Sequence, residues 1–79
     1  MMSKAEWETL KQLHERGVWD GDLISKQARD SLMKRGLVDR SRKFVSGPYA
    51  GCQINELTND GVKLARLCRE LDEKYGAAT

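Results

Sequence analysis

Residues 28–38 read ARDSLMKRGLV, and this stretch decides how the middle of the chain folds. Ala28 and Leu32 are four residues apart, the spacing that places two side chains on one face of a helix. Gly36 can adopt the left-handed conformation with which many helices end. Upstream, Ser25 is a typical N-cap residue. The stretch therefore predicts a helix that Ser25 caps and that ends at the residue before Gly36.

Towards the N-terminus, a second helix is expected. Ser3 and Glu6 have the spacing of a capping box, and Gly17 marks the end of the helix that they open. Its inward arc at helical spacing consists of Trp7, Leu10, Leu13 and His14. Residues 18–24, with an Asp-Gly turn signal in the middle, leave room for a single helical turn or a loop.

Downstream, two short runs predict a β-hairpin. Leu37 to Val45 forms one run and Cys52 to Glu56 the other, with apolar and polar residues alternating in the second. The connection over residues 46–51 has Pro48 at its centre and a glycine on each side, which suits a turn.

The last predicted helix begins at Thr58, which is a typical cap residue. Polar residues Lys63, Arg66 and Glu70 are expected on its outer face. Its apolar stripe consists of Gly61, Leu64, Ala65, Cys68, Leu71 and Tyr75, with Leu67 at the edge. The residues after Gly76 are expected to fray.

The order helix, short turn, helix, hairpin, long helix resembles the winged helix-turn-helix domain. Two segments carry the likeness: residues 28–38, quoted above, and residues 54–61, which read INELTNDG. They are similar to the "Leu, basic, basic, Gly, Leu, Val" exit and the "Leu-Thr-x-x-Gly" helix start of MarR- and PadR-type repressors. The likeness covers roughly residues 4 to 75, and it departs from the family pattern in its abbreviated second helix.

What the resemblance implies is a fold and a function. The fold is of the α+β, mainly α class: a winged helix with a three-helix core, a two-stranded β-hairpin wing and a long C-terminal helix. The function is that of a small transcriptional regulator of bacterial or phage type that binds double-stranded DNA in the major groove through its recognition helix.

Length and composition bound the remaining classes. A chain of 79 residues with 39% hydrophobic and 33% charged residues fits a single small domain, expected over residues 3–76 with flexible termini at 1–2 and 77–79. The two cysteines, Cys52 and Cys68, and the single histidine do not form a zinc motif, so we expect no metal and no cofactor. Cys52 and Cys68 read as reduced thiols that could face each other between the hairpin and the last helix.

Neither a targeting signal nor a catalytic motif stands out in the sequence. Nothing in the sequence resembles a signal peptide or a membrane span, so a cytoplasmic location is expected. His14 reads as a packed side chain rather than a general base, and we expect no enzymatic activity.

Charge is distributed unevenly along the chain. The net charge is +2, but residues 26–43 hold seven basic and two acidic side chains, a local net of +5. The resemblance puts this segment in the recognition helix and the first wing strand, the elements that approach phosphates. The candidate DNA-binding residues are Lys26, Gln27, Arg29 and Lys34 on the helix, and Arg40, Arg42, Lys43 and Tyr49 on the wing.

These candidates have different expected roles. Gln27 and Arg29 are residue types that read base edges, whereas Arg40, Arg42 and Lys43 would contact phosphates from the wing. Asp30 opposes the assignment, because a carboxylate on the presented face repels phosphate and is placed to pair with Lys34. A plain solvated basic face therefore remains open.

Two further alternatives remain open. The Tyr49 ring either reaches a sugar or minor groove from the wing tip or folds back on the hairpin, and Trp19 is either a core anchor or a partner contact. More broadly, the chain is either a DNA-binding protein or a protein-interaction module on a winged-helix scaffold that no longer binds DNA.

The breadth of the apolar stripe on the last helix predicts a partner. One neighbouring helix covers a stripe of about 100°, and this stripe is wider. A two-fold homodimer through Leu64, Leu67, Leu71 and Tyr75 would cover the rest.

Overall fold

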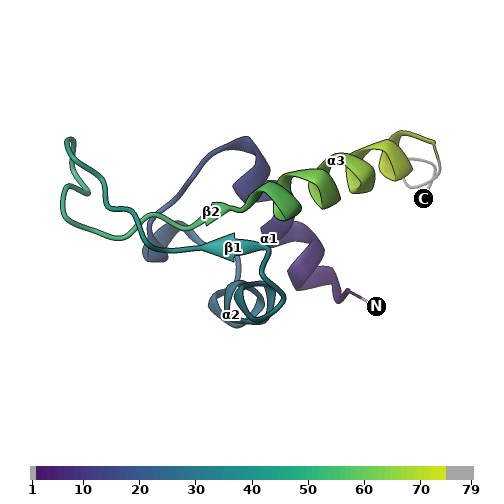
Figure 1. The fold of residues 1–79 in the computed structure, drawn as a ribbon, viewed down its shortest axis with the longest axis horizontal. Helices are drawn as coiled ribbons and strands as arrows, with labels where there is room; N and C mark the ends of the chain where they lie inside the picture. Colours follow the sequence, from purple (N-terminus) through teal and green to yellow (C-terminus); the bar gives the residue numbers. More distant parts are fainter. Residues whose placement is uncertain (1, 75–79) are drawn as a thin grey trace.

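The computed structural model describes residues 2–74, with side chains described to residue 71. It is an α+β fold, mainly helical, measuring 40 × 24 × 20 Å. The elements are α1 (Lys4–Glu15), η1 (Asp20–Asp22), α2 (Lys26–Lys34), β1 (Val38–Asp39), β2 (Glu56–Leu57) and α3 (Asn59–Lys74). The turn between β1 and β2 and the C-terminal end of α3 lie at opposite ends of the long axis (Figure 1).

The predicted capping box opens α1. The Glu6 amide donates to Ser3 Oγ at 3.2 Å, and the Ser3 amide donates to Glu6 Oε1 at 3.0 Å. The second Glu6 oxygen accepts from Ser31 Oγ on α2 at 2.9 Å. These hydrogen bonds hold the pKa of Glu6 below its usual range, the bond from the Ser3 backbone being the largest cause. Glu6 therefore fixes the start of α1 and also joins it to α2.

Helix α2 begins and ends as its sequence predicts. Ser25 Oγ accepts from the Ala28 amide at 3.1 Å. At the other end Gly36 has φ of 76°, its amide donates to Met33 O, and the Leu37 amide donates to Leu32 O. This pair of bonds is a Schellman motif, which stops the helix and turns the chain into β1.

The hairpin is shorter and less regular than predicted. Its regular part is two residues per strand, Val38 opposite Leu57 and Asp39 opposite Glu56, and a separate bridge joins Lys43 to Gln53. Between these pairings three residues, 40–42, face two, 54–55, so the first run contains a β-bulge.

A third segment, unpredicted from the sequence, pairs with the other edge of the second run. The Val18 amide donates to Asn55 O at 3.1 Å, and the Asn55 amide donates to Val18 O at 2.8 Å. The segment between α1 and α2 is thereby attached to the hairpin.

The turn region has the predicted glycine chemistry. Gly47 and Gly51 both have positive φ, and the Ala50 amide donates to Gly47 O across Pro48. Gly51 in turn donates to Phe44 O at 2.9 Å, which closes the loop.

The start of α3 is bonded directly to the exit of α2. Thr58 Oγ1 accepts from the Gly61 amide at 3.1 Å, which makes Thr58 the predicted cap, and it donates to Gly36 O at 2.7 Å. The Thr58 amide donates to Leu37 O. A Cβ on Gly61 would lie 2.2 Å from Leu37 O, so only glycine allows this close approach.

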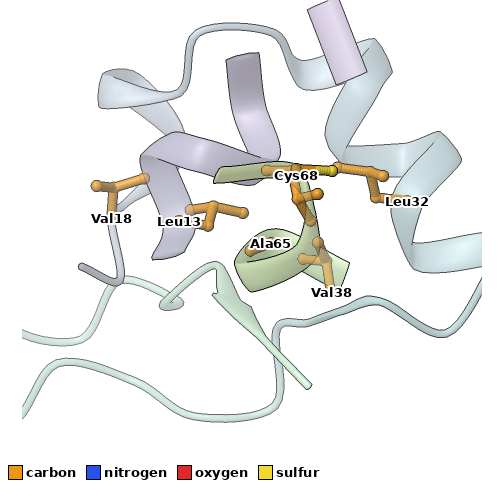
Figure 2. Close-up of a cluster of buried hydrophobic side chains, with 7 residues drawn as sticks. Leu13, Val18, Leu32, Val38, Ala65 and Cys68 are labelled. Carbon is orange, nitrogen blue, oxygen red and sulfur yellow. The ribbon is translucent and has the colours of Figure 1, made fainter. Parts of the chain in front are cut away.

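The core lies where the three helices meet the hairpin (Figure 2). Its buried members are Leu10, Leu13, Val18, Leu32, Val38, Ala65 and Cys68. Met2, which the sequence placed in a flexible terminus, is half-buried and packs against this cluster. In α1, Trp7 and His14 are half-buried, and His14 Nδ1 accepts from Arg69 Nε on α3 at 2.8 Å.

The wide apolar stripe of α3 is divided between core and solvent. Gly61, Ala65 and Cys68 are buried and Leu64 is half-buried, whereas Leu67 and Leu71 are 51% and 44% exposed. Tyr75, the fourth residue of the predicted dimer contact, lies outside the described residues.

Candidate nucleic-acid interface

The N-terminal part of α2 presents two of the predicted DNA-binding residues to solvent. Lys26 and Gln27 occupy the first turn after Ser25, and both are exposed. Because the first amide groups of a helix point outward with a partial positive charge, this turn is a favourable place for a phosphate. The two side chains are available for the roles that the sequence suggests.

Arg29 was predicted to flank the same outward face, and the structure corrects this. It is 7% exposed. Its Nη1 donates to Asp20 Oδ1 at 2.9 Å and to Asn55 Oδ1 at 3.0 Å, and its Nε donates to Asp30 Oδ1 at 2.8 Å. The guanidinium turns inward because Asp20 and Asn55 cover this side of α2. In this arrangement Arg29 does not reach a base edge.

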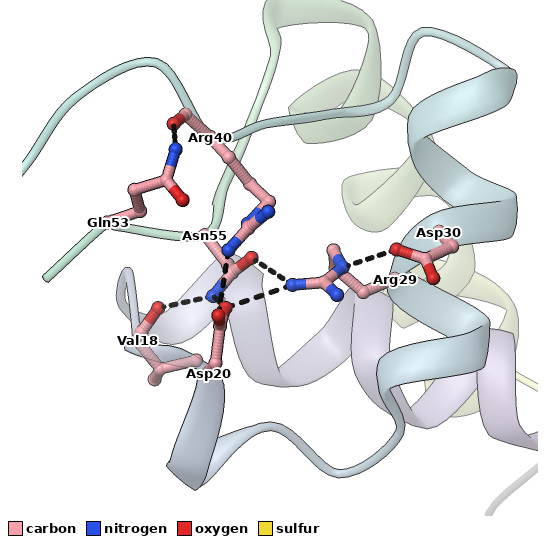
Figure 3. Close-up of polar contacts among 7 residues, drawn as sticks. All are labelled: Val18, Asp20, Arg29, Asp30, Arg40, Gln53 and Asn55. Carbon is pink, nitrogen blue, oxygen red and sulfur yellow. Dashed lines mark hydrogen bonds and ion pairs between the residues drawn. The ribbon is translucent and has the colours of Figure 1, made fainter.

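Arg40 belongs to the same polar cluster, shown in Figure 3. Its Nη2 donates to Asp20 Oδ2 at 2.7 Å, and its side chain is 24% exposed. Asp20 thus accepts from one arginine of α2 and one of the hairpin. Arg40 therefore has an internal ion-pair partner, and its phosphate contact stays a prediction.

Asn55 completes this cluster, which we call the Asp20 cluster: Asp20, Arg29, Arg40 and Asn55. Its Nδ2 donates to Asp20 Oδ1 and to Val18 O, both at 2.9 Å, and it is fully buried. The hydrogen bond from Asn55 is the largest cause that lowers the pKa of Asp20 below its usual range, and the charges of Arg40 and Arg29 lower it further against the effect of burial. The cluster fixes the hairpin relative to α2.

Asp30 does not pair with Lys34 as predicted. It pairs with Arg29, its neighbour in sequence. Lys34 is exposed and has no ion pair with a carboxylate of residues 2–71. The positive charge of Lys34 is therefore not neutralised within α2.

On the hairpin, Arg42 is exposed but paired. Its Nε and Nη2 donate to the two oxygens of Glu56, each at 2.7 Å, while the side chain stays 70% exposed. Glu56 raises the pKa of Arg42 through these bonds and its charge. Since an exposed ion pair contributes little stability, a phosphate can compete with Glu56 for this guanidinium.

Lys43 is exposed on the hairpin, and the described carboxylates offer it no ion pair. It borders a shallow depression of about 450 Å³ whose other lining residues are Trp19, Asp20, Gly51, Cys52 and Gln53. Among the hairpin candidates Lys43 is the one whose charge is open to solvent and unpaired within the described residues.

Tyr49 folds back rather than extending from the hairpin. Its ring stacks on Trp19 with centroids 4.8 Å apart and an interplanar angle of 18°. Val45, just before the turn region, is 95% exposed. Of the two alternatives for Tyr49, the structure shows the packed ring, and Trp19 is its internal partner.

Other titratable groups gather less closely. Among the described residues no group of three or more His, Cys, Asp or Glu side chains is placed to hold a metal ion. Cys68 is buried in the core and Cys52 borders the depression beside Trp19, so the two cysteines lie in different parts of the fold.

Sequence reasoning missed Asp20 and Asn55, the residues that organise the site. Asp20 was assigned only to a turn and Asn55 to the polar side of a strand. A polar residue between apolar positions of the strand was the available signal for Asn55, whereas nothing local to Asp20 indicates two arginine partners 9 and 20 residues away.

Comparisons with known proteins add no further constraint. Neither protein-family models, nor curated proteins, nor solved structures gave a match to this chain. Across the part of the chain that the structure describes, no helix has the length and apolar character needed to cross a membrane.

Proposed function

We propose that this chain is a small winged-helix protein that binds double-stranded DNA as a homodimer and regulates transcription without catalysing a reaction. The order of its elements supports this: α1, a strand-like residue Val18, a single turn η1, α2, a hairpin and α3. The single turn at η1 agrees with the abbreviated second helix of the resemblance.

The observation that carries the proposal is the separation of the cations into two groups. Arg29 and Arg40 neutralise Asp20 and join α2 to the hairpin. Lys26, Lys34 and Lys43, on those same two elements, stay exposed without a carboxylate partner among the described residues. The internal arginines thus hold two lysine-bearing elements in a fixed relation.

Such an arrangement suits a polyanion. Each lysine that contacts a phosphate releases condensed counterions, so affinity depends steeply on salt. With Arg42 released from Glu56, about four contacts give a log-log salt slope of about −3.6. Gln27, exposed beside Lys26, is placed to contact base edges if α2 enters a major groove.

A second candidate is a protein-interaction module on the same scaffold. The burial of Arg29 and the internal pairing of Arg40 favour it, because these two cations are lost to DNA. The two candidates make opposite predictions for binding at low salt.

The test is fluorescence anisotropy of a labelled random-sequence duplex titrated with the protein between about 25 and 200 mM salt. The parent is expected to bind with micromolar affinity that weakens with the slope given above. The Lys26→Ala, Lys34→Ala double variant is expected to bind about tenfold more weakly at low salt. Its log-log salt slope is expected to be shallower than that of the parent by about 2.

A charge-matched control separates the loss of these two phosphate contacts from a general effect of net charge. Lys4 and Arg66 are also exposed and lie outside α2 and the hairpin, so replacing both with alanine is expected to change affinity much less. Equal losses in the two double variants would contradict the assigned surface, and no binding by the parent at low salt would favour the protein-interaction module.

A further inference from the structure

Helix α3 leaves an apolar strip in solvent. Leu67 and Leu71 are 51% and 44% exposed, and Leu64 beside them is half-buried. These three residues follow the i, i+3, i+7 spacing of one helical face, here called the α3 strip. Large side chains clustered in this way mark an interaction surface more often than isolated ones do.

Two opposite charges flank the α3 strip on one side. Lys63 and Glu70 are seven residues apart, close to two helical turns, so they occupy the same flank at different heights. Both are exposed, and neither side chain has an ion pair with another described residue. On this flank the positive charge of Lys63 therefore lies nearer the N-terminal end of α3 and the negative charge of Glu70 nearer its C-terminal end.

We infer that the α3 strip is the contact with a second copy of this chain, and that the two α3 helices run antiparallel across a two-fold axis near Leu67. When the two-fold axis is perpendicular to the helices, the same patch of both copies meets with the helix directions reversed. The reversal sets Lys63 of one copy against the partner's Glu70, and Glu70 against the partner's Lys63. A parallel pair would instead bring like charges to the same height.

The two kinds of contact have different roles. The leucines remove apolar area from water and supply most of the affinity. The charges stay at the rim, where they contribute little affinity but select the orientation of the helices. The C-terminal half of α3 and the hairpin turn lie at opposite ends of the molecule (Figure 1), so this contact leaves the hairpins uncovered.

This inference deepens the proposed function, which assumes two copies, and it is tested without DNA so that the two can fail separately. The measurement is sedimentation equilibrium of the full chain across a concentration series. The parent is expected to reach twice the 9.0 kDa mass of one chain, and Leu67→Asp to raise the dimer Kd at least tenfold. Val45→Asp, at the 95% exposed hairpin position, is the matched control and is expected to leave the Kd unchanged.

A charge swap tests the antiparallel arrangement itself. Lys63→Glu and Glu70→Lys each place like charges together, and each is expected to raise the Kd by about fivefold at low salt. The double variant Lys63→Glu, Glu70→Lys reverses every pair and is expected to return the Kd to near the parent value. A parent that remains monomeric at all concentrations, or a double variant weaker than both single ones, would overturn the inference.

Discussion

Arg29 and Lys26 lie on the same helix and have opposite environments, because residues distant in sequence reach only one of them. The arginine meets Asp20, Asp30 and Asn55, whereas the lysine is exposed. A helical wheel records only the angle of a side chain around its own axis. Two of the three oxygens that bind the guanidinium come from Asp20 and Asn55, which lie outside α2, so the helical pattern could not predict that Arg29 is buried.

At the scale of residues, the Asp20 cluster and Glu6 predict how the stability of the fold depends on pH. The pKa values of Asp20 and Glu6 are both lowered in the folded state, from ordinary values of 3.8 and 4.5. The folded protein therefore binds fewer protons than the unfolded chain at acid pH, and its stability rises with pH. We expect the contribution of these two carboxylates to the free energy of unfolding to be complete above about pH 5. It falls as the pH drops through their lowered pKa values in the folded state.

Urea denaturation of the parent and of Asp20→Asn at several pH values checks this. Because the Asp20 side chain is 39% exposed, solvent screens its ion pairs, and the variant is expected to lose only about 1 kcal/mol at pH 6. The difference from the parent should shrink towards pH 3. Asp22→Asn on the same turn is the control, and a difference that stays constant with pH would contradict the assignment.

At the scale of elements, the two sequence segments that resemble the winged helix are parts of one joint. Thr58 donates hydrogen bonds to the carbonyl oxygens of Gly36 and Leu37, and Gly61 packs on the Leu37 carbonyl. The co-occurrence of the two segments is thus explained by the geometry of the fold. Their presence carries structural information and says nothing by itself about DNA.

Replacing Gly61 with alanine tests this joint. A Cβ there would lie 2.2 Å from Leu37 O and 3.1 Å from Leu57 Cβ, so α3 has to move away from the exit of α2. Although alanine ordinarily stabilises a helix relative to glycine, we expect Gly61→Ala to lower the free energy of unfolding by about 1–3 kcal/mol. Thermal or urea denaturation checks it, with Asn59→Ala in the same turn as control. An unchanged or higher stability would show that the close approach is not needed.

Helices and caps were the elements best predicted from the sequence. Ser3, Ser25, Gly36 and Thr58 act through neighbours three or four residues away, so local pattern suffices for them. The sequence predicted where the hairpin lies in the chain, but it did not predict which residues pair across it. Its bulge at residues 40–42 and its pairing with Val18 include Arg40 and Asn55 of the Asp20 cluster, whose long-range contacts no local pattern reveals.

At the scale of the whole molecule, the uneven charge along the sequence is partly cancelled by folding. Of the basic side chains in residues 26–43, Arg29, Arg35, Arg40 and Arg42 have carboxylate partners. Lys26, Lys34 and Lys43 have none among the described residues. The local net of +5 therefore overstated the unpaired charge: the four arginines of this segment have carboxylate partners, whereas the three lysines have none among the described residues.

The measurement that most directly tests DNA binding by these lysines is acetylation footprinting, read by mass spectrometry with and without a duplex at low salt. Bound phosphates should slow the modification of Lys26, Lys34 and Lys43 together, by about fivefold or more at saturating duplex, while Lys4 reacts at an unchanged rate. Equal rates with and without the duplex at all three lysines, or slowing at Lys4 alone, would contradict the proposed surface.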